Sequence, residues 1–523
     1  MASFYVQNFG CRATQADGAA IERQFEERGL DRASELAEAE IVVLNTCTVT
    51  SSADQDARAA IRRVHRENPQ ARIVVTGCYA QRSPEELAAL PGVSQVIGNS
   101  HKHQLAEITI REAVSQPRTA PHGASGFVPL RTLLASWDSG QRPYSPCPER
   151  SEGTNDQGQG FSRRPTTDDR RRVWVSDIFA HTELLAAPVF DAANERTRPN
   201  LKVQDGCDNR CSFCVIPYVR GQSRSLKLDQ ILQEVNAMVA AGYRELVISG
   251  INLGRWGRDL EAGVRSQLSG VRTTAHADEQ IAYDVGFSRR LTTDDRRLVV
   301  LIRTILDRTS LEKLRISSVE PMDWSDELIA LVATSPRIAK HAHVPMQSGS
   351  DAVLRRMHRK YRPWHYREKI EKIRAAMPTA AIGADVMVGF PGETEAEFAE
   401  TRRMIEDLPF TYLHVFTYSA RPGTPAAGMP NQVAVRVARE RNRILRELGE
   451  KKKLSFMQSF VGKTVEAITL SRGADTPAGR TFPIFTEALT DNYLKLRLRG
   501  DHEPNRWVQA QVEHCVDGAL VAT

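Results

Sequence analysis

Short hydrophobic runs alternate with amphipathic segments over roughly the first 110 residues. Three β-rich runs end in small or polar residues, FYVQNFG, IVVLNT and RIVVTG, and helical patterns at 18–28 and 53–67 lie between them. Strands that alternate with helices in this way form parallel sheets. Residues 1–110 are therefore expected to form an open parallel α/β sheet domain.

The same alternation returns from about residue 197 to 440. Six runs are strand candidates: LKVQDG, ELVISG, LRISSVE, HAHVPM, AIGADVMVGF and YLHVFTY. Between them lie helical segments such as 228–241, whose apolar residues fall on one face. This repetition predicts a full or partial (β/α) barrel within a domain of residues 173–445.

A long charged helix follows, from VAVRV to KKKLSF, and the last sixty residues then have strand patterns. The runs VGKTVEAITL, NYLKLRL and RWVQAQVEHCV are separated by turn residues. Residues 458–523 are expected to form a small antiparallel β-barrel, a fold that often binds RNA.

Two stretches interrupt these patterns, at 111–172 and at about 262–297. Both are rich in proline, glycine, serine and charge, and they share a near-identical dodecamer, GFSRRPTTDDRR and GFSRRLTTDDRR. Such sequences bury little apolar surface, so they are interpreted as low-complexity inserts. The alternative is a basic patch that grips RNA.

Composition narrows the class of protein. A chain of 523 residues is too long for one hydrophobic core, and 41% hydrophobic with 26% charged residues is ordinary for a globular protein. No run is long enough to cross a bilayer, and the N-terminus lacks a secretory pattern, so a cytoplasmic location without membrane contact is expected. The net charge of +6 permits an anionic partner such as RNA.

Three of the eight cysteines lie within eight positions of one another: Cys207, Cys211 and Cys214. A cubane iron–sulfur cluster usually has four thiolate ligands, so three leave one iron open, as a catalytic metal needs. Zinc is an alternative, although zinc sites usually have paired two-cysteine knuckles or nearby histidines. A set of buried structural cysteines is a further alternative.

Cys11, Cys47 and Cys78 lie far apart in the sequence, but each follows a predicted strand. The carboxyl ends of parallel strands share one edge of a sheet, which makes these thiols candidates for a second common site. Chance is the alternative, because cysteine favours buried strands in any case.

The spacing Cys207-x3-Cys211-x2-Cys214 on a barrel loop resembles the signature of radical S-adenosylmethionine (SAM) enzymes. The order of the three domains resembles the methylthiotransferases, whose C-terminal barrel is called TRAM. The resemblance implies a [4Fe–4S] cluster on these cysteines that binds SAM and generates a radical. It also implies a second [4Fe–4S] cluster on Cys11, Cys47 and Cys78, whose open iron bears the transferred sulfur.

Several motifs resemble one methylthiotransferase branch: NFGCRATQADG, VQDGCDNRCSFCVIPYVRG and HVPMQSGSDAVLRRMHRKY. That branch is a sulfur-group transferase that acts at C2 of N6-threonylcarbamoyladenosine at position 37 of tRNA. Thr14 stands where the branch usually has asparagine, a change not expected to touch a cluster ligand. The alternatives are the branches that modify N6-isopentenyladenosine in tRNA or an aspartate of a ribosomal protein. The implied partners are the tRNA anticodon stem-loop and a low-potential electron donor such as flavodoxin or ferredoxin.

Polar and glycine-rich loops follow the predicted barrel strands and are expected at the C-terminal mouth, where barrel active sites lie. Glu320 and Gln347 are candidates to hydrogen-bond the ribose or amino group of SAM, and glycines let backbone approach a ligand. The candidate SAM contacts are Gly250, Ser318, Glu320, Gln347 and Gly389. The alternative for each polar residue is a merely solvated loop position, and no catalytic residue is assigned beyond the clusters.

Basic residues on the barrel and the preceding helix suit tRNA phosphates. They are Lys463, Arg472, Lys495, Arg497 and Arg499 on the barrel, and Arg436, Arg439, Arg441, Arg446 and Lys451 to Lys453 on the helix. A solvated charged helix is the alternative, since acidic residues are interleaved. Phe390, Tyr412 and Tyr418 are candidates to stack on an unstacked adenine, or are core residues.

Overall fold

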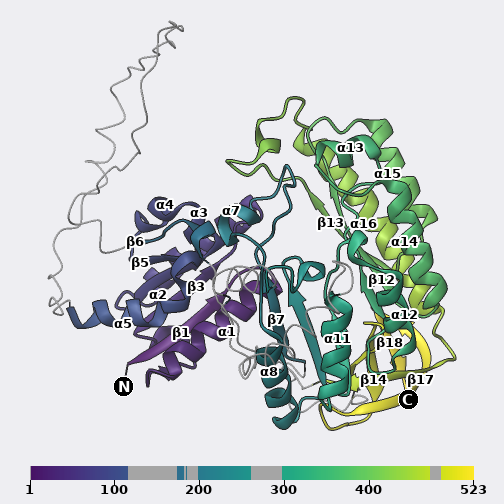
Figure 1. Cartoon of the computed structure of the whole chain (residues 1–523), viewed down its shortest axis with the longest axis horizontal. Helices are drawn as coiled ribbons and strands as arrows, with labels where there is room; N and C mark the ends of the chain where they lie inside the picture. The colour runs from purple at the N-terminus through teal and green to yellow at the C-terminus, as the bar shows by residue number, and fades with distance from the viewer. Residues whose placement is uncertain (1, 116–172, 182–183, 185–197, 261–296, 471–484) are drawn as a thin grey trace, which may run out of the picture. The chain divides into compact units, whose positions relative to one another are not determined.

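The computed structural model describes residues 2–115, 173–181, 184, 198–260, 297–470 and 485–523 (Figure 1). The chain divides into two compact units, residues 1–106 with 172–523, and residues 107–171. Of the second unit only the latter part of helix α5 (Leu105–Ser115) is described. The first copy of the dodecamer and nearly all of the second lie outside the described residues, as does Cys147.

The N-terminal domain is an open sheet of parallel strands in the order β2-β1-β3-β4-β5-β6, which confirms the predicted fold class. The three predicted strands are present, with three more that the sequence patterns did not predict. The strands are β1 (Ser3–Asn8), β2 (Asp31–Arg32), β3 (Ile41–Thr46), β4 (Arg72–Gly77), β5 (Val93–Gly98) and β6 (Val173–Trp174). Because β6 pairs with β5, this sheet takes its edge strand from beyond the first insert.

Two longer helices connect these strands, α1 (Arg12–Glu26) and α2 (Ser51–Glu67). Helix α2 begins where Thr50 caps it, its hydroxyl accepting the Ala53 N–H at 3.2 Å. Helix α1 begins six residues before the predicted start at Gly18. Gly18 therefore lies inside the helix and does not mark its start. A Cβ at this position would lie 2.0 Å from the Asn8 side chain, which explains why the residue is glycine.

The central domain contains all six predicted strands, arranged as a partial barrel. One sheet has the order β10-β9-β7-β8 and the next has the order β11-β12-β13. Between the two sheets the Val319 N–H donates to the His343 carbonyl at 3.1 Å. The strands are β7 (Asn200–Asp205), β8 (Arg224–Ser225), β9 (Glu245–Gly250), β10 (Lys313–Ile316), β11 (His341–His343), β12 (Ala381–Val388) and β13 (Tyr412–Thr417).

Helices cover one side of these strands, as Figure 1 shows for α14 and α15 beside β12. The helices of this domain are α7 (Ile216–Arg220), which contacts α3 (Cys78–Arg82) of the N-terminal domain, and α8 (Leu228–Ala240), α11 (Arg297–Arg308), α12 (Asp326–Thr334), α13 (Asp351–Arg356), α14 (Pro363–Ala376), α15 (Glu395–Asp407) and α16 (Val435–Gln458). Among the described residues, no helix is both long and apolar enough to span a membrane.

Strand alternation separates the two faces of the second sheet. On β12 the side chains at even positions belong to the main hydrophobic core with residues of α14 and α15: Ile382, Ala384, Val386 and Val388. Successive side chains of a strand point to opposite faces, so Gly383 and Asp385 face the concave inner side. The inner side of this partial barrel is therefore where polar strand residues collect.

The C-terminal domain is a closed barrel with the strand order β14-β15-β16-β18-β17. Its strands are β14 (Thr464–Thr469), β15 (Phe485–Thr490), β16 (Lys495–Arg499), β17 (Trp507–Val516) and β18 (Ala519–Ala522). The prediction of a small barrel is confirmed, with one addition: β16 and β18 pair in parallel, whereas the other pairs are antiparallel. Residues such as Leu496, Val512 and Leu520 fill its core.

Candidate active site

The cysteine loop of the central domain begins directly after β7. Its backbone is held at both ends: the Cys207 N–H donates to the Gly221 carbonyl at 3.0 Å, and the Ser212 N–H donates to the Met357 carbonyl at 3.1 Å. Gly206 has a φ of +71°, and a Cβ there would lie 1.9 Å from the Gln222 carbonyl oxygen. The loop is thus anchored at the carboxyl ends of the barrel strands, as predicted.

Nitrogen donors surround the sulfurs of this loop. The Asn209 backbone N–H and the Asn252 amide donate to Cys207 Sγ at 3.4 and 3.7 Å, and the Arg359 guanidinium donates to Cys211 Sγ at 3.2 Å. Burial, and then the neighbouring Cys211, raise the pKa of Cys214 to about 12. A metal that ligates the thiolates removes that cost, so this donor set fits an iron–sulfur cluster.

Glu320 lies beside this loop, in a pocket that Cys211, Arg359 and Tyr361 also line. The Arg359 guanidinium pairs with the Glu320 carboxylate and lies 4.9 Å from the centre of the Tyr361 ring. One arginine therefore connects Cys211 to the carboxylate that the sequence suggested as a SAM contact.

Gln347 is buried and has a positive φ of 63°, a conformation uncommon for residues other than glycine. Its side-chain oxygen is buried and has no hydrogen-bond partner among the described residues. An unpaired buried acceptor costs about 1–3 kcal/mol, so this atom fits a site that a donor group of a ligand completes.

The other suggested SAM contacts differ in character. Ser318 and Gly250 are half-buried at the ends of β10 and β9, where a Cβ on Gly250 would lie 2.8 Å from the Gln204 side-chain oxygen. Gly389 has a φ of +75°, and a Cβ there would lie 2.5 Å from the Ala438 Cβ. Close packing against α16 accounts for glycine at that position.

The N-terminal cysteines come together because their strands are neighbours. Cys11, Cys47 and Cys78 follow β1, β3 and β4, which lie side by side in the sheet. A Cβ on Gly10 would lie 3.0 Å from Cys47 Sγ, so the Cys11 loop passes over Cys47. Burial, then Cys78 and more weakly Cys11, raise the pKa of Cys47 to about 12. These three thiols form a second donor set that fits a cluster.

Two polar side chains contact this second set. The Asn99 amide donates to Cys78 Sγ at 3.6 Å, and the Thr14 hydroxyl lies 3.6 Å from Cys11 Sγ. The expectation that position 14 touches no cluster ligand is therefore wrong. The first turn of α1 begins directly after Cys11, and this turn brings the hydroxyl back to the sulfur.

A buried ionic network lies next to the N-terminal cysteines. Asp17 of α1 pairs with Lys102 at 2.9 Å, with Arg220 at 3.0 Å and with Lys202, and the last two also pair with Asp205. Burial would raise the pKa of Asp17, but these three cations outweigh it and hold that pKa well below its usual value. Arg224 lies 4.0 Å from Asp205, so the network joins α1 to β7 and α7 and places four cations against two carboxylates.

Sequence reasoning missed three polar side chains that contact the cysteine sulfurs: Asn99, Asn252 and Arg359. Asn252 lies in the loop SGINLG and Arg359 in the basic run HRKYR, so both segments were visible, but nothing in their spacing indicated a contact with sulfur. Asn99 carried no such signal, because its partner Cys78 lies 21 positions away in the sequence.

The suggested RNA contacts are divided by the structure. Arg441 is buried and donates to Glu393, and Lys452 donates to the carbonyls of Glu406 and Leu408, so these two cations serve the fold. The exposed cations are Arg436, Arg439, Arg446, Lys451, Lys463, Lys495 and Arg499, whereas Lys453 and Arg497 are half-buried and Arg472 lies outside the described residues. Phe390 is a core residue, Tyr412 is half-buried and hydrogen-bonded to His341 and His343, and Tyr418 packs edge-on against Phe390.

Comparisons with known proteins agree with this arrangement. Residues 3–98 match the Uncharacterized protein family UPF0004, and residues 201–405 match the Radical SAM superfamily. The threonylcarbamoyladenosine tRNA methylthiotransferase MtaB of Bacillus subtilis is 32% identical over 96% of this chain and 92% of its own length. The protein of that name from Aquifex aeolicus is 31% identical over 97% of this chain and 99% of its own length.

A relative from another branch also matches, the tRNA-2-methylthio-N(6)-dimethylallyladenosine synthase of Thermobifida fusca, at 31% identity over 89% of this chain and 77% of its own length. The alignment with the solved radical SAM methyltransferase TsrM of Kitasatospora setae covers 82% of this chain and 77% of that chain, with a TM-score of 0.45 and 14% identity. Because these relatives align with most of the chain at about 31% identity, the chain belongs to the radical SAM methylthiotransferase family. Several of the relatives carry the name of the threonylcarbamoyladenosine tRNA branch, which is the better supported of the two branches.

Proposed function

We propose that this protein adds a methylthio group to C2 of N6-threonylcarbamoyladenosine at position 37 of tRNA. It acts as a sulfur-group transferase with SAM and two [4Fe–4S] clusters. The observation that carries the proposal is the presence of two separate cysteine triads, each at the carboxyl ends of parallel strands. A relative named for this reaction aligns with the chain almost from end to end.

The cysteines are assigned to the clusters by their positions. Cys207, Cys211 and Cys214 hold the cluster that binds SAM, and the strand-end triad of the N-terminal sheet, Cys11, Cys47 and Cys78, holds the second cluster. When bound, these groups supply one-electron cleavage of SAM at the first site and sulfur at the second.

The surrounding side chains orient SAM. Arg359 fixes the Glu320 carboxylate, and the unpaired side-chain oxygen of Gln347 accepts a hydrogen bond from an amino or hydroxyl group of SAM. Gly250 and Ser318 line the same strand ends, and Gly389 shapes the loop by packing against α16.

The partners follow from the chemistry of the reaction. The tRNA anticodon stem-loop contacts exposed cations such as Lys463 and Lys495 of the barrel and Arg439 of α16. A low-potential donor such as flavodoxin or ferredoxin supplies electrons. Thiolate ligands require reduced cysteines, so the reaction belongs in a reducing cytoplasm.

Anaerobic cluster reconstitution and nucleoside analysis test the proposal. The wild-type chain is expected to hold about eight irons, four for each cluster. Deletion of the gene is expected to remove methylthio-threonylcarbamoyladenosine from tRNA, and the wild-type gene restores it. The matched control is Cys515→Ala on β17, which belongs to neither triad and leaves iron and product unchanged. Four irons per chain, or loss of methylthio-isopentenyladenosine instead, contradicts the proposal.

A second candidate function is methylthiolation of N6-isopentenyladenosine. The observation in its favour is the 31% identity to the relative from Thermobifida fusca, which is close to the identity found for the first branch. Overall identity separates the two substrates weakly, so a feature of the substrate pocket has to distinguish them. The nucleoside profile decides between the two candidates directly.

A further inference from the structure

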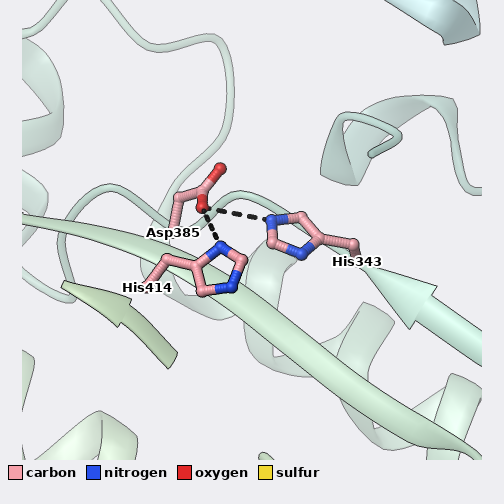
Figure 2. Close-up of side chains that lie close together, drawn as sticks. All are labelled: His343, Asp385 and His414. Atoms are coloured by element: carbon pink, nitrogen blue, oxygen red, sulfur yellow. Dashed lines mark ion pairs between the residues drawn. The ribbon is translucent and has the colours of Figure 1, made fainter. Parts of the chain in front are cut away.

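Three polar side chains from three neighbouring strands converge inside the partial barrel. His343 of β11, Asp385 of β12 and His414 of β13 point toward one another (Figure 2). His343 Nε2 and His414 Nδ1 lie 3.2 and 3.4 Å from the same carboxylate oxygen, Asp385 Oδ1. None of these three residues is a proposed cluster ligand. The side chains of β12 that belong to the hydrophobic core point to the opposite face of the sheet.

The charge of Asp385 fixes the direction of the hydrogen bonds. Burial would raise its pKa, but the hydrogen bonds from His343 and His414 outweigh burial and hold that pKa well below its usual value. An ionised carboxylate only accepts, so both imidazoles donate to it. In the tautomer that carries its proton on Nε2, His343 accepts the Tyr412 hydroxyl through Nδ1 at 3.0 Å, and Tyr412 accepts His341 Nε2–H at 2.7 Å.

The floor beneath the triad is tightly packed. The Tyr412 ring crosses Gly383, where a Cβ would lie 1.9 Å from its Cζ atom. Tyr493 of the C-terminal barrel stacks on His341 with ring centres 5.0 Å apart. The triad is therefore held from below by contacts that leave it little freedom to move.

The upper side of the triad is open. The His414 side chain is 62% exposed and that of Asp385 is 27% exposed, whereas His343 is 10% exposed. Among the described residues, Asp385 Oδ2 and His414 Nε2 have no hydrogen-bond partner. One carboxylate oxygen and one ring nitrogen thus remain available to a group that enters the barrel.

The triad lies on the inner side of the barrel, next to the residues proposed to hold SAM. The Asp385 backbone carbonyl accepts the N–H groups of Met346 and Gln347 at 3.1 and 2.8 Å. The His343 carbonyl accepts the Val319 N–H, next to Ser318 and Glu320. A nucleoside that presents its base to the radical at the barrel mouth brings its substituents to this depth.

We propose that His343, Asp385 and His414 form the subsite for the N6 substituent of the substrate adenosine and select threonylcarbamoyl over isopentenyl. This inference rests on the proposed function and specifies how its substrate is chosen. The threonylcarbamoyl group carries N–H and O–H donors for Asp385 Oδ2 and acceptors for a histidine. An isopentenyl group is hydrocarbon and would remove water from the triad without replacing its hydrogen bonds.

The negative charge of the threonylcarbamoyl carboxylate also has a complement nearby. Arg12 donates to the Tyr493 hydroxyl at 2.7 Å, and the Arg315 guanidinium lies 4.9 Å from the centre of the same ring. After burial, the field of Arg315 and more weakly of Arg12 lowers the pKa of His341 on the barrel floor. Arg315 is already paired with Glu245 at 2.7 Å, so Arg12 is the cation that can complement an anionic substituent here.

The test compares holoenzyme variants on two tRNAs that differ only in the N6 substituent of adenosine 37. His414→Leu removes the exposed imidazole, and Asp385→Asn keeps the shape of that side chain but removes its charge. His65→Leu, an exposed histidine of α2, is the matched control. Methylthiolation kcat/KM is measured on both tRNAs, with iron content, thermal midpoint and deoxyadenosine formation as parallel readouts.

Wild type and the His65 variant are expected to prefer the threonylcarbamoyl tRNA strongly. His414→Leu is expected to lower kcat/KM on that tRNA roughly tenfold, the value of one hydrogen bond, and to raise the relative rate on the isopentenyl tRNA. Asp385→Asn is expected to lower it further. Iron content and deoxyadenosine formation stay at wild-type levels in both variants, since neither position contacts a cysteine.

An unchanged preference in a folded His414→Leu enzyme overturns the inference while leaving the proposed function intact. A wild-type enzyme that acts only on the isopentenyl tRNA is a failure of the proposed function itself. The same three donors also resemble a two-histidine, one-carboxylate metal site. One divalent ion per chain beyond cluster iron, lost in both variants, would assign the triad to a metal and also overturn direct recognition.

Discussion

The cysteines of the two triads are brought close together in different ways. Cys207, Cys211 and Cys214 belong to one loop after β7, so their proximity is a local property of the chain. Cys11, Cys47 and Cys78 follow three strands that become neighbours only in the sheet. A local triad is visible as a spacing, whereas an assembled triad depends on strand order.

Their surroundings differ as well. The barrel triad is half-buried and has an arginine in contact with Cys211. In the N-terminal triad Cys47 and Cys78 are buried, Cys11 is exposed, and the nearest cations belong to a buried ionic network. Under the proposed function, SAM enters the barrel site beside a cation, whereas the N-terminal site holds the second cluster.

The largest expected difference between the triads comes from removing one cysteine of each. Cys211→Ala is expected to abolish both deoxyadenosine formation and methylthiolation, because SAM cleavage depends on that loop. Cys47→Ala is expected to abolish methylthiolation but retain deoxyadenosine formation. Each variant should lose about four irons per chain. Retained methylthiolation in Cys47→Ala would remove the N-terminal triad from the reaction.

Asp17→Asn tests the network beside the N-terminal triad. Removing this carboxylate leaves Lys102, Lys202 and Arg220 buried with Asp205 alone, so a loss of about 3–5 kcal/mol of stability is expected. The Asp17 contribution is present above about pH 4 and is lost as the pH falls toward its lowered folded pKa. Urea unfolding of the wild type and of Asp17→Asn at pH 7 measures this loss of stability.

The control for Asp17→Asn is Arg443→Ala, an exposed residue whose ion pairs with Glu440 and Glu447 are screened by solvent and are expected to contribute little stability. Equal losses of stability in the two variants would show that the buried network contributes no more than a surface pair.

Arg359→Gln is expected to affect the barrel triad alone. It removes the donor to Cys211 Sγ and releases Glu320, so SAM cleavage should fall roughly 10–100-fold, as for other outer partners of metal ligands. The reduction potential of that cluster should become more negative, because a cation is lost beside it. Arg359→Lys should recover part of both values. An unchanged potential in Arg359→Gln would contradict the positioning role.

The smallest expected effects come from the two asparagines that contact sulfur. Asn252→Ala removes the amide from Cys207 and should lower SAM cleavage less than tenfold, below the range usual for outer partners of metal ligands. Asn99→Ala removes the amide from Cys78 and should slow methylthiolation while SAM cleavage stays unchanged. Single-turnover assays separate the two steps, and an identical pattern in both variants would erase the distinction between the sites.

Much of the fold was predictable because the periodicities were strong. All six barrel strands and the long helix before the C-terminal barrel appear where the hydrophobic runs placed them. Three of the missed strands, β2, β6 and β8, have only two residues each, too short to show alternation. Strand β5 (Val93–Gly98) was missed although it has six residues. The start of α1 was missed because Gly18 resembles a boundary, although its lack of a side chain serves packing against Asn8.

The sequence by itself determined the radical SAM loop, since three cysteines within eight positions necessarily lie close together. It also determined the order of the three domains along the chain. Only the tertiary structure decided that β1, β3 and β4 are neighbours, that Arg359 reaches Cys211, and that His343, Asp385 and His414 meet inside the barrel. The physical reason is distance along the chain. Spacing records local geometry, but contacts between residues tens to hundreds of positions apart depend on how strands pair and helices pack.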